Sequence, residues 1–380
     1  MIYFDNAATT FPKPNKVYEA IDFVNRNLAV NAGRGSYQLA HKANDLINQA
    51  RTDIARLSGT EAEEVIFMPS NTFAMNSIIC GLDWDRSKKV YVTPFEHNAV
   101  MRPLNLCAKQ HGCKINVIPF RQKDFALLED ELDRMFAKEN PDYVFINHAS
   151  NVVGNICPID IISKLAKQYK ALIVLDVAQT FGVVDVKKIV PLVDFIVFAG
   201  HKNLFGPLGV GGFINVSGIK LNTVFAGGTG SDSLNLEMPQ DMPLKYEIGS
   251  PNISAIAGLS AGIKWVEDSG LEAIANHKSQ LIDRLVSGLS KLNKVNLFLP
   301  IKKDYLTGVL SFSVEGYEAH DVGMILNDEF DIAVRTGYHC APLVHSLIGS
   351  EQNGGTVRVS VSYFNTVEEV DKLIEAIGSL

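Results

Sequence analysis

Asp176 and Lys202 each lie at the C-terminal end of an apolar run of the sequence. As a carboxylate and an amine, they are together suited to holding one kind of cofactor. Residues 171–176 read Ala-Leu-Ile-Val-Leu-Asp, and residues 194–202 read Asp-Phe-Ile-Val-Phe-Ala-Gly-His-Lys. Apolar runs without alternation are typical of parallel strands that helices cover on both faces. Because ligands of open α/β sheets bind beyond the carboxyl ends of the strands, we expect this acid and this amine to face one crevice. Pyridoxal phosphate needs such a pair, a lysine to bind its aldehyde as a Schiff base and an acid to keep its pyridine nitrogen protonated.

Polar side chains at other strand ends favour this interpretation over a strand-capping aspartate and a solvated lysine. Asn71 and Thr72 follow an apolar run and begin a helical stretch, where N–H groups and a hydroxyl can bind a phosphate or simply cap the helix. His97 follows the next strand and is suited to stacking on a flat ring or moving protons, although a structural histidine has the same pattern. Asn151 and Gln179 follow two further strands. Successive strand ends thus deliver polar groups to one side of the predicted sheet.

The elements that would position these residues alternate between strands and helices. Such alternation predicts an α/β fold with a doubly wound, mainly parallel, seven-stranded sheet. The last two strands are joined by a Gly/Pro loop that is too short for a parallel crossover, which predicts that the final strand is antiparallel. The predicted strands are 65–68, 90–93, 114–118, 143–146, 171–176, 194–198 and 210–214. The predicted helices are 16–27, 39–57, 72–81, 98–110, 128–138 and 159–169.

The pattern changes near residue 250. Residues 217–250 are rich in Gly, Ser, Asn and Pro and predict an irregular segment. Two long helical patterns and a smaller set of strands follow, which predict a separate α+β region. We expect a large cofactor-binding domain of residues 16–250 and a small domain formed by 1–15 together with 251–380. The C-terminal elements are predicted at 252–267, 271–292, 308–314, 356–362 and 366–378.

Composition and charge exclude several classes of function. The 380 residues are 47% hydrophobic and 20% charged, and the net charge of -7 includes no block of like charges. This favours neither nucleic acid nor an anionic membrane as a partner. The N-terminus lacks the pattern of a signal peptide, and no apolar stretch is long enough to span a bilayer. We therefore expect a soluble cytoplasmic protein.

Cys340 differs from the other four cysteines in its sequence context. Five scattered cysteines do not make a disulfide framework. Cys340 lies in a loop between a glycine and a proline, beside His339, and this context predicts an accessible thiol, although an inert loop thiol has the same pattern. His339, Cys340 and His345 lack a second ligand pair with zinc-site spacing, so we expect no metal site.

Blocks along the whole chain, in the same order, resemble the class V aminotransferase superfamily and, within it, the branch of cysteine desulfurases and selenocysteine lyases. The resemblance implies fold type I of the pyridoxal phosphate enzymes, with a large and a small domain. The blocks are Tyr-Phe-Asp-Asn-Ala-Ala-Thr-Thr (3–10), Leu-Asp-Val-Ala-Gln (175–179), Ala-Gly-His-Lys-Asn-Leu-Phe-Gly-Pro-Leu-Gly (199–209), Tyr-Glu-Ile-Gly-Ser-Pro-Asn (246–252), Arg-Thr-Gly-Tyr-His-Cys (335–340) and Thr-Val-Arg-Val-Ser-Val-Ser-Tyr-Phe-Asn-Thr (356–366).

The resemblance implies a role for each matching position. Lys202 would bind the cofactor aldehyde, Asp176 would pair with the pyridinium nitrogen, and His97 would stack on the ring and shuttle protons. Gln179 would bind the phenolic oxygen, with Asn151 nearby at the substrate. The phosphate would be held by Asn71, Thr72 and His201, and by Ser250 of a second subunit. Arg358 would bind the substrate carboxylate, a bidentate task suited to guanidinium, and Arg34 is a further candidate near the substrate.

The implied activity is that of a cysteine desulfurase. L-cysteine would be converted to L-alanine, with the sulfur held as a persulfide on Cys340 for a protein acceptor, in a homodimer. The alternatives are a selenocysteine lyase, a cysteine-sulfinate lyase, a transaminase with a bystander thiol, or a scaffold that has lost activity. One position departs from the family pattern, because Ala199 stands where many relatives have a Ser or Thr that contacts the phosphate.

Overall fold

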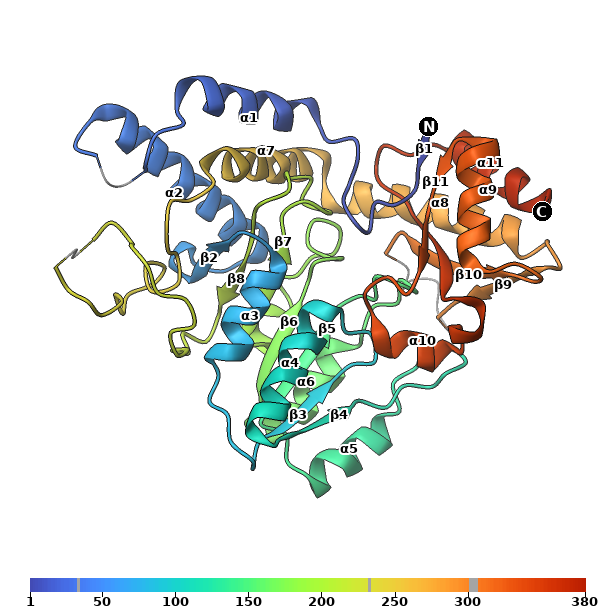
Figure 1. The fold of residues 1–380 in the computed structure, drawn as a ribbon, viewed down its shortest axis with the longest axis horizontal. Helices are drawn as coiled ribbons and strands as arrows, with labels where there is room; N and C mark the ends of the chain where they lie inside the picture. Colours follow the sequence, from blue (N-terminus) through green and yellow to red (C-terminus); the bar gives the residue numbers. More distant parts are fainter. Residues whose placement is uncertain (33–34, 232–233, 301–306) are drawn as a thin grey trace.

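The computed structural model describes residues 1–32, 35–231, 234–300 and 307–380. Within these ranges, seven strands form one sheet in the order β2-β8-β7-β6-β5-β3-β4 (Figure 1). The strands are β2 (Val65–Met68), β3 (Lys89–Val92), β4 (Lys114–Val117), β5 (Tyr143–Asn147), β6 (Leu172–Asp176), β7 (Phe195–Ala199) and β8 (Gly211–Asn215). The pairs among β4, β3, β5, β6 and β7 are parallel, and β8 is antiparallel to both neighbours. The predicted mainly parallel sheet and its antiparallel last strand are confirmed.

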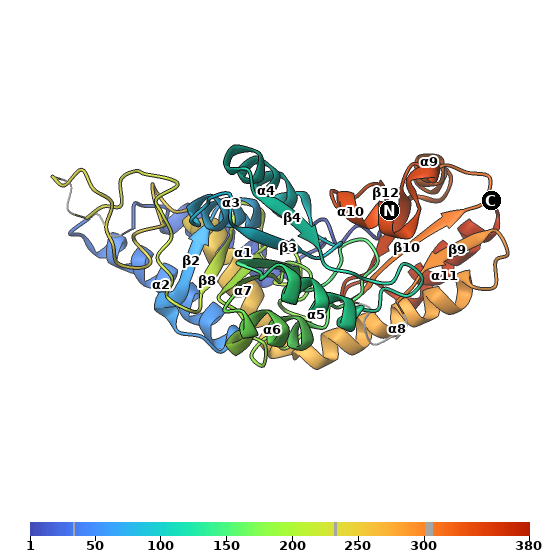
Figure 2. The ribbon, with the colours of Figure 1, turned by 90° about the horizontal axis from the view of Figure 1, so that it is seen from below.

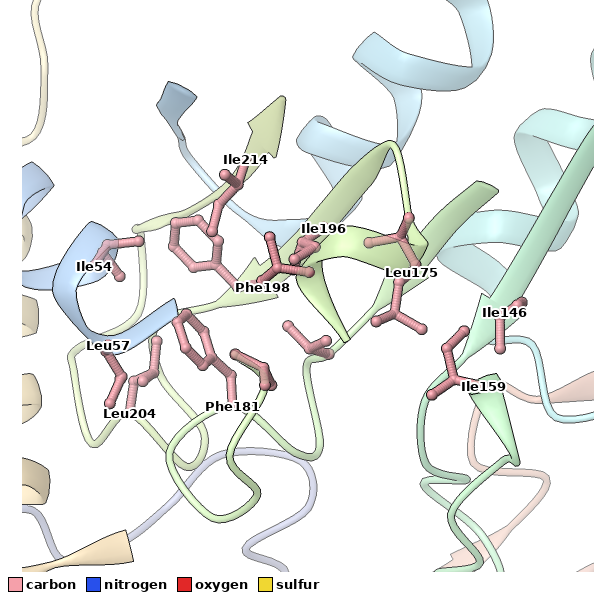
Figure 3. Packing of buried hydrophobic residues seen from close by; sticks show 14 of the residues in the cluster. Ile54, Leu57, Ile146, Ile159, Leu175, Phe181, Ile196, Phe198, Leu204 and Ile214 are labelled. Atoms are coloured by element: carbon pink, nitrogen blue, oxygen red, sulfur yellow. The ribbon is translucent and has the colours of Figure 1, made fainter. Parts of the chain in front are cut away.

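The sheet is apolar on both faces because successive residues of each strand point to opposite sides. On β7, Phe195 and Val197 pack with one cluster, whereas Ile196 and Phe198 pack with the other. Figure 3 shows the second cluster, where Phe198 lies near Ile54. Helices cover both faces, which explains the absence of polar alternation in the strand sequences.

The buried faces of the covering helices belong to the two hydrophobic clusters, one on each face of the sheet. Residues of α3 and α4 pack on one face, and residues of α2, α5, α6 and α7 pack on the other. Helix α7 also lies along α1 (Figure 1). The helices are α1 (Asn15–Asn27), α2 (Gln38–Ser58), α3 (Asn71–Gly81), α4 (Asn98–His111), α5 (Glu129–Lys138), α6 (Ile159–Gln168) and α7 (Ile253–Ser269). Each agrees with the sequence prediction to within two residues, because the apolar spacing that predicts a helix is the spacing that buries it.

A second region follows α7. Among the described residues, four strands form an antiparallel sheet in the order β12-β13-β10-β9, and β1 pairs in parallel with β11. The strands are β1 (Ile2–Tyr3), β9 (Val295–Phe298), β10 (Val309–Val314), β11 (Ile332–Ala333), β12 (Arg335–Gly337) and β13 (Thr356–Ser360). The helices are α8 (Leu271–Leu289), α9 (Ala319–Phe330), α10 (Pro342–Ile348) and α11 (Val367–Gly378), and short 3₁₀ turns lie at Ala62–Glu64, Val190–Leu192 and Glu351–Asn353.

Helix α8 and the N-terminal segment connect the two regions. Figure 2 shows α8 running from the large sheet to the small one. Its residue Ile274 packs with Phe205, whereas Leu281 and Leu285 pack in the cluster of the antiparallel sheet. The N-terminal segment crosses in the opposite direction and contributes Phe4 to the same cluster. The division into domains at residues 250 and 251 stays a prediction. Across the described ranges, none of the helices has the length and apolarity that a membrane crossing requires.

Candidate active site

A cavity of about 220 Å³ lies where the carboxyl ends of the parallel strands face the antiparallel region. Both regions supply its walls, because residues of β12, β13 and the loop before α10 line it together with residues that follow β2, β3, β5, β6 and β7. The predicted site residues that it brings together are Asn71, Thr72, His97, Asn151, Asp176, Gln179, His201, Lys202, Cys340 and Arg358. Their roles stay predictions, but their convergence on one cavity is a property of the fold.

Asp176 and Lys202 lie at the end of β6 and just beyond β7, which are parallel neighbours. One carboxylate oxygen of Asp176, Oδ1, accepts hydrogen bonds from the Ala178 N–H at 2.9 Å and from Asn71 Nδ2 at 3.0 Å. Burial raises the pKa of Asp176 despite these bonds and the nearby Lys202 ammonium. The surrounding protein also desolvates Lys202, which lowers its pKa to about 8 although Asp176 attracts its charge. The charge of each group therefore shifts the pKa of the other.

The start of α3 presents hydrogen-bond donors to the same cavity. The Ser70 hydroxyl caps the helix by accepting the Phe73 N–H at 3.3 Å. The N–H groups of Asn71 and Thr72 come first in the helix and have no carbonyl one turn earlier within it. Such N–H groups, with the positive end of the helix dipole, bind anions. Ala199 lines the cavity too and offers only a methyl group, so position 199 supplies no hydroxyl to a ligand.

His97 begins α4 and is held as its cap. Its Nδ1 accepts the Ala99 N–H at 3.0 Å, which fixes the ring orientation and leaves Nε2 as the protonated nitrogen of the neutral ring. Burial, followed by the charge of Lys202, lowers the pKa of His97 to about 4. The imidazole is therefore neutral at physiological pH, and it is available to donate its Nε2–H or to stack against a planar ligand.

Several buried polar atoms of the cavity residues lack a protein partner. Among the described residues, His201 Nδ1, Asn151 Oδ1 and Arg358 Nε are buried and make no hydrogen bond. Buried polar atoms are almost always paired in native proteins. These three come from separate segments that line one cavity, and they indicate that a polar ligand completes the site.

Arg358 is the most buried charged group of the cavity, with 2% of its surface exposed. Its Nη1 donates to the Asn151 carbonyl at 3.1 Å, and its Nη2 donates to Asp5 Oδ1 at 2.5 Å. These contacts hold the planar guanidinium in place, and its unpaired Nε–H remains for a ligand. A fixed, buried guanidinium is suited to binding a carboxylate.

Cys340 is exposed and lies on a loop with unusual backbone geometry. His339 and Cys340 have φ values of 49° and 57°, in the left-handed region that non-glycine residues rarely adopt. Three contacts hold the loop: the Asn98 N–H donates to the Cys340 carbonyl at 2.7 Å, Asn151 Nδ2 donates to the His339 carbonyl at 2.8 Å, and His339 Nε2 lies 2.8 Å from Thr356 Oγ1. The thiol is thus presented at the cavity by a restrained loop.

A sequence profile described as aminotransferase class-V matches residues 2–373. The chain belongs to the class V aminotransferase family. A "Probable cysteine desulfurase" of Pyrococcus abyssi is 33% identical, over 100% of this chain and 94% of that protein. Another, of Methanothermobacter thermautotrophicus, is 30% identical over 100% of this chain and 94% of its own length.

Solved structures agree with the sequence comparison. The apo structure of a cysteine desulfurase from Thermococcus onnurineus NA1 has a TM-score of 0.92 and 32% identity, covering 100% of this chain and 94% of that one. The predicted resemblance and the predicted fold type I architecture are therefore confirmed.

Ser250, a predicted site residue of this class V aminotransferase, does not line the cavity of its own chain. Ser250 lies on the exposed irregular segment before α7, and its hydroxyl accepts from Asn31 Nδ2 at 3.5 Å. Arg34 lies outside the described residues. The prediction for Ser250 concerned a second subunit, so its position outside its own cavity does not contradict that prediction.

The sequence reasoning missed residues in and next to the cavity, among them Arg335, Asp5 and Glu96. Arg335 lines the cavity, and Asp5 pairs with Arg358 behind it. Both belong to blocks that carry the family resemblance, which is the signal that was available. Glu96 precedes His97, and its Oε1 accepts the Thr93 hydroxyl and the Asn147 N–H, each at 2.6 Å. Burial raises the pKa of Glu96 to about 8, and nothing local in the sequence predicts that a glutamate is buried here.

Proposed function

We propose that this chain is a pyridoxal phosphate-dependent cysteine desulfurase, which converts L-cysteine to L-alanine and carries the sulfur as a persulfide on Cys340. One observation carries the proposal: the exposed thiol of Cys340 lines the same cavity as Lys202 and Asp176. The lysine and the acid are the pair that the cofactor requires, and a thiol beside them is what sulfur transfer requires. The names of the relatives support the same assignment.

The residues present fit pyridoxal phosphate. Asp176 supplies a carboxylate for the ring nitrogen, and the start of α3 supplies N–H groups for the phosphate. The unpaired Nδ1 of His201 is a further donor or acceptor at the cavity wall. Gln179 lies at the same wall and donates from Nε2 to the Ala7 carbonyl at 2.9 Å, which fixes the side chain that would bind the phenolic oxygen. When bound, the cofactor withdraws electrons from the Cα of an amino acid.

Three side chains then act on the substrate, each with a different role. Arg358 binds the α-carboxylate and orients the amino acid. Lys202, with its pKa lowered to about 8, is an effective base near neutral pH and takes the Cα proton. His97 would stack on the ring of the cofactor, and its Nε2 proton is the one that it would exchange with the substrate thiol. These three side chains reach the cavity from three separate segments.

Cys340 performs the sulfur transfer. Its thiolate attacks the sulfur of the substrate, so that a sulfur–sulfur bond forms and the bond between Cβ and sulfur breaks. The electron pair of the broken bond stays with the carbon skeleton, which is protonated at Cβ and at Cα to give alanine. The balance is one cysteine and one protein thiol giving one alanine and one persulfide. A protein that accepts this sulfur is part of the proposal.

Alanine release from L-cysteine tests this function directly. The purified, cofactor-loaded protein and its Cys340→Ala variant are assayed with a reductant present. Cys113→Ala is the matched thiol control, because Cys113 lies beyond the C-terminal end of α4. We expect alanine from the wild type and the control and almost none from Cys340→Ala. Equal activity of Cys340→Ala and the wild type would refute the persulfide step. No alanine from any loaded protein would favour selenocysteine or transamination as the reaction.

We further propose that the active form is a homodimer in which Ser250 completes the phosphate site of the second subunit. Support comes from the exposure of Ser250 and from apolar side chains on the same irregular segment, where Leu234 and Leu236 are 98% and 100% exposed. This segment projects away from the large sheet (Figure 1, yellow). Sedimentation equilibrium should give twice the chain mass, and Ser250→Ala should weaken cofactor retention. A monomer that retains full activity would contradict the proposal.

A further inference from the structure

The side chain of Glu96 continues the hydrogen-bond ladder between two strands of the large sheet. Strand β3 pairs in parallel with β5, and the Thr93 N–H extends this ladder by donating to the Phe145 carbonyl at 3.2 Å. The following bond is made by a side chain, because the Asn147 N–H donates to Glu96 Oε1 at 2.6 Å. The Thr93 hydroxyl donates to the same oxygen at 2.6 Å. Glu96 therefore fastens the loop after β3 to the carboxyl end of β5.

His97 lies between this fastening and a second contact. Glu96 precedes it, and the N–H of Asn98, which follows it, donates to the Cys340 carbonyl at 2.7 Å. His97 Nδ1 accepts the Ala99 N–H, so the ring orientation depends on the backbone of residues 96–99. Glu96 itself does not line the cavity, whereas His97 does. Any effect of Glu96 on a ligand is therefore indirect.

The carboxyl group of Glu96 is uncharged at neutral pH. Its side chain is 0% exposed, and burial, with a further contribution from the charge of Asp176, raises its pKa to about 8. Among the described residues, Glu96 Oε2 is buried without a hydrogen-bond partner, which costs far less for a protonated oxygen than for an ionised one. Oε1 acts only as an acceptor, so the amide oxygen of glutamine can replace it. Glu96→Gln is therefore a conservative variant that can keep both hydrogen bonds.

We propose that Glu96 is a positioning residue, which holds the His97 ring in the orientation that stacking on a planar ligand requires. Groups behind a binding site act in this way when they fix the side chains that contact the ligand. The inference rests on the proposed function for the identity of that ligand, pyridoxal phosphate. The hold on His97 itself is a property of the chain without any cofactor.

Losing the carboxyl group should release His97. Glu96→Met fills the same space without an oxygen, so the Asn147 N–H and the Thr93 hydroxyl are left buried without their acceptor. The loop after β3 then moves to find other partners, and the His97 ring moves with it. Thr93→Val removes one of the two donors and replaces Glu96→Met in the measurements if that variant does not fold.

Nitrogen NMR of the histidine rings in the apoprotein tests the hold on His97. The wild type and Glu96→Gln should show the neutral Nε2–H tautomer with a hydrogen-bonded Nδ1. In Glu96→Met the signals should move toward the mixture of tautomers of a freely turning imidazole. His97→Gln assigns the signals, and His277 of α8 is the internal reference.

A double-mutant cycle tests whether Glu96 acts through His97. Calorimetry gives the dissociation constant of pyridoxal phosphate for the apoproteins of the wild type, Glu96→Met, His97→Ala and the double variant. We expect Glu96→Met to weaken binding about tenfold, as lost stacking would, and to cause no further loss when His97 is already alanine. Glu96→Gln should bind like the wild type.

Asp142→Ala is the matched control. Asp142 Oδ2 accepts the Lys89 N–H at 2.8 Å, so Asp142 fastens the same two strands at their amino ends, away from the cavity. This variant should leave the His97 signals and the cofactor affinity unchanged. An unmoved His97 signal in Glu96→Met, an additive loss in the double variant, or equal losses in Glu96→Met and Asp142→Ala would each overturn the inference.

The two readouts separate this inference from the proposed function. If none of the apoproteins binds pyridoxal phosphate while the His97 signals move as expected, the proposed function fails and the hold of Glu96 on His97 stands. If the wild type binds the cofactor and releases alanine from cysteine while the His97 signals stay in place in Glu96→Met, the inference fails and the proposed function stands.

Discussion

The side-chain amide of Asn151 donates a hydrogen bond to the main-chain carbonyl of His339, with an Nδ2–O distance of 2.8 Å. Its own main-chain carbonyl accepts from Arg358 Nη1 at 3.1 Å. Asn151 therefore connects the loop that carries Cys340 with the guanidinium expected to bind the substrate carboxylate. The residue comes from the loop after β5 in the large sheet, so it joins the two regions at the point where the chemistry is expected.

Asn151→Ala should slow sulfur transfer more than it weakens cofactor binding. Losing the amide leaves the His339 carbonyl without its partner and releases the left-handed backbone at Cys340, at a cost of about 1–3 kcal/mol. We expect kcat for alanine formation to fall about tenfold. The measurement is alanine release together with the cofactor content by absorbance. Asn27→Ala, which removes an exposed side chain of α1, is the control. An equal loss in both variants would contradict the role of Asn151 in holding the Cys340 loop.

The rate of covalent cofactor uptake by the apoprotein should follow the titration of Lys202. Burial lowers the pKa of Lys202 to about 8, and the neutral amine is the form that attacks an aldehyde. The uptake rate should therefore rise about tenfold per pH unit below pH 8 and level off above it. Stopped-flow absorbance measures the rate, and Lys202→Ala, which cannot react, corrects for noncovalent binding. A midpoint near the ordinary lysine value would contradict the prediction.

Arg358→Lys should raise KM for L-cysteine at least about tenfold and change kcat less. An ammonium donates from a single nitrogen, so it cannot hold Asp5 and the Asn151 carbonyl as Nη2 and Nη1 do while it presents a further N–H to a carboxylate as Nε does. Steady-state kinetics of alanine release separates the two constants. Arg284→Lys is the control, because Arg284 pairs with Asp371 on the exposed surface. Should KM remain at the wild-type value, the carboxylate-binding role of Arg358 would be refuted.

Lys278 should impose a pH dependence on stability. This lysine of α8 is buried, its Nζ donates to Asn203 Oδ1 at 2.8 Å, and burial lowers its pKa to about 7 from 10.5. Between these two values the unfolded chain holds the proton and the folded chain has lost it, so the free energy of unfolding rises with pH. Below pH 7 both states are protonated and this contribution is constant.

Lys278→Met removes this contribution. The free energy of unfolding of the wild type minus that of the variant should increase by about 1 kcal/mol per pH unit between pH 7.5 and pH 9.5. Urea denaturation at several pH values measures it, with the exposed Lys372→Met of α11 as the control. Parallel curves for the wild type and Lys278→Met would show that Lys278 does not titrate as the folded structure implies.

The elements of the large sheet were predictable because each strand is buried on both faces. An apolar run such as 194–198 is distinctive, and helical periodicity between such runs leaves few other topologies. The prediction was weaker for the antiparallel region. Strands β9, β11 and β12 and helices α9 and α10 had no prediction. Of these, β11 and β12 are only two and three residues long, and α10 is a seven-residue helix. Contacts made after folding, rather than local propensity, decide such short elements.

The sequence alone determined which groups lie at the strand ends, and the cofactor that we propose follows from those groups. Asp176 and Lys202 could be paired from the chain because parallel neighbouring strands end at one edge. Only the tertiary structure decided what faces them from the other side of the cavity. Asp5 and Arg358 are separated by 353 positions, and no periodicity connects them, so their ion pair exists only because the N-terminal segment crosses to the antiparallel sheet. The position of the Arg358 guanidinium at the cavity wall follows from that packing.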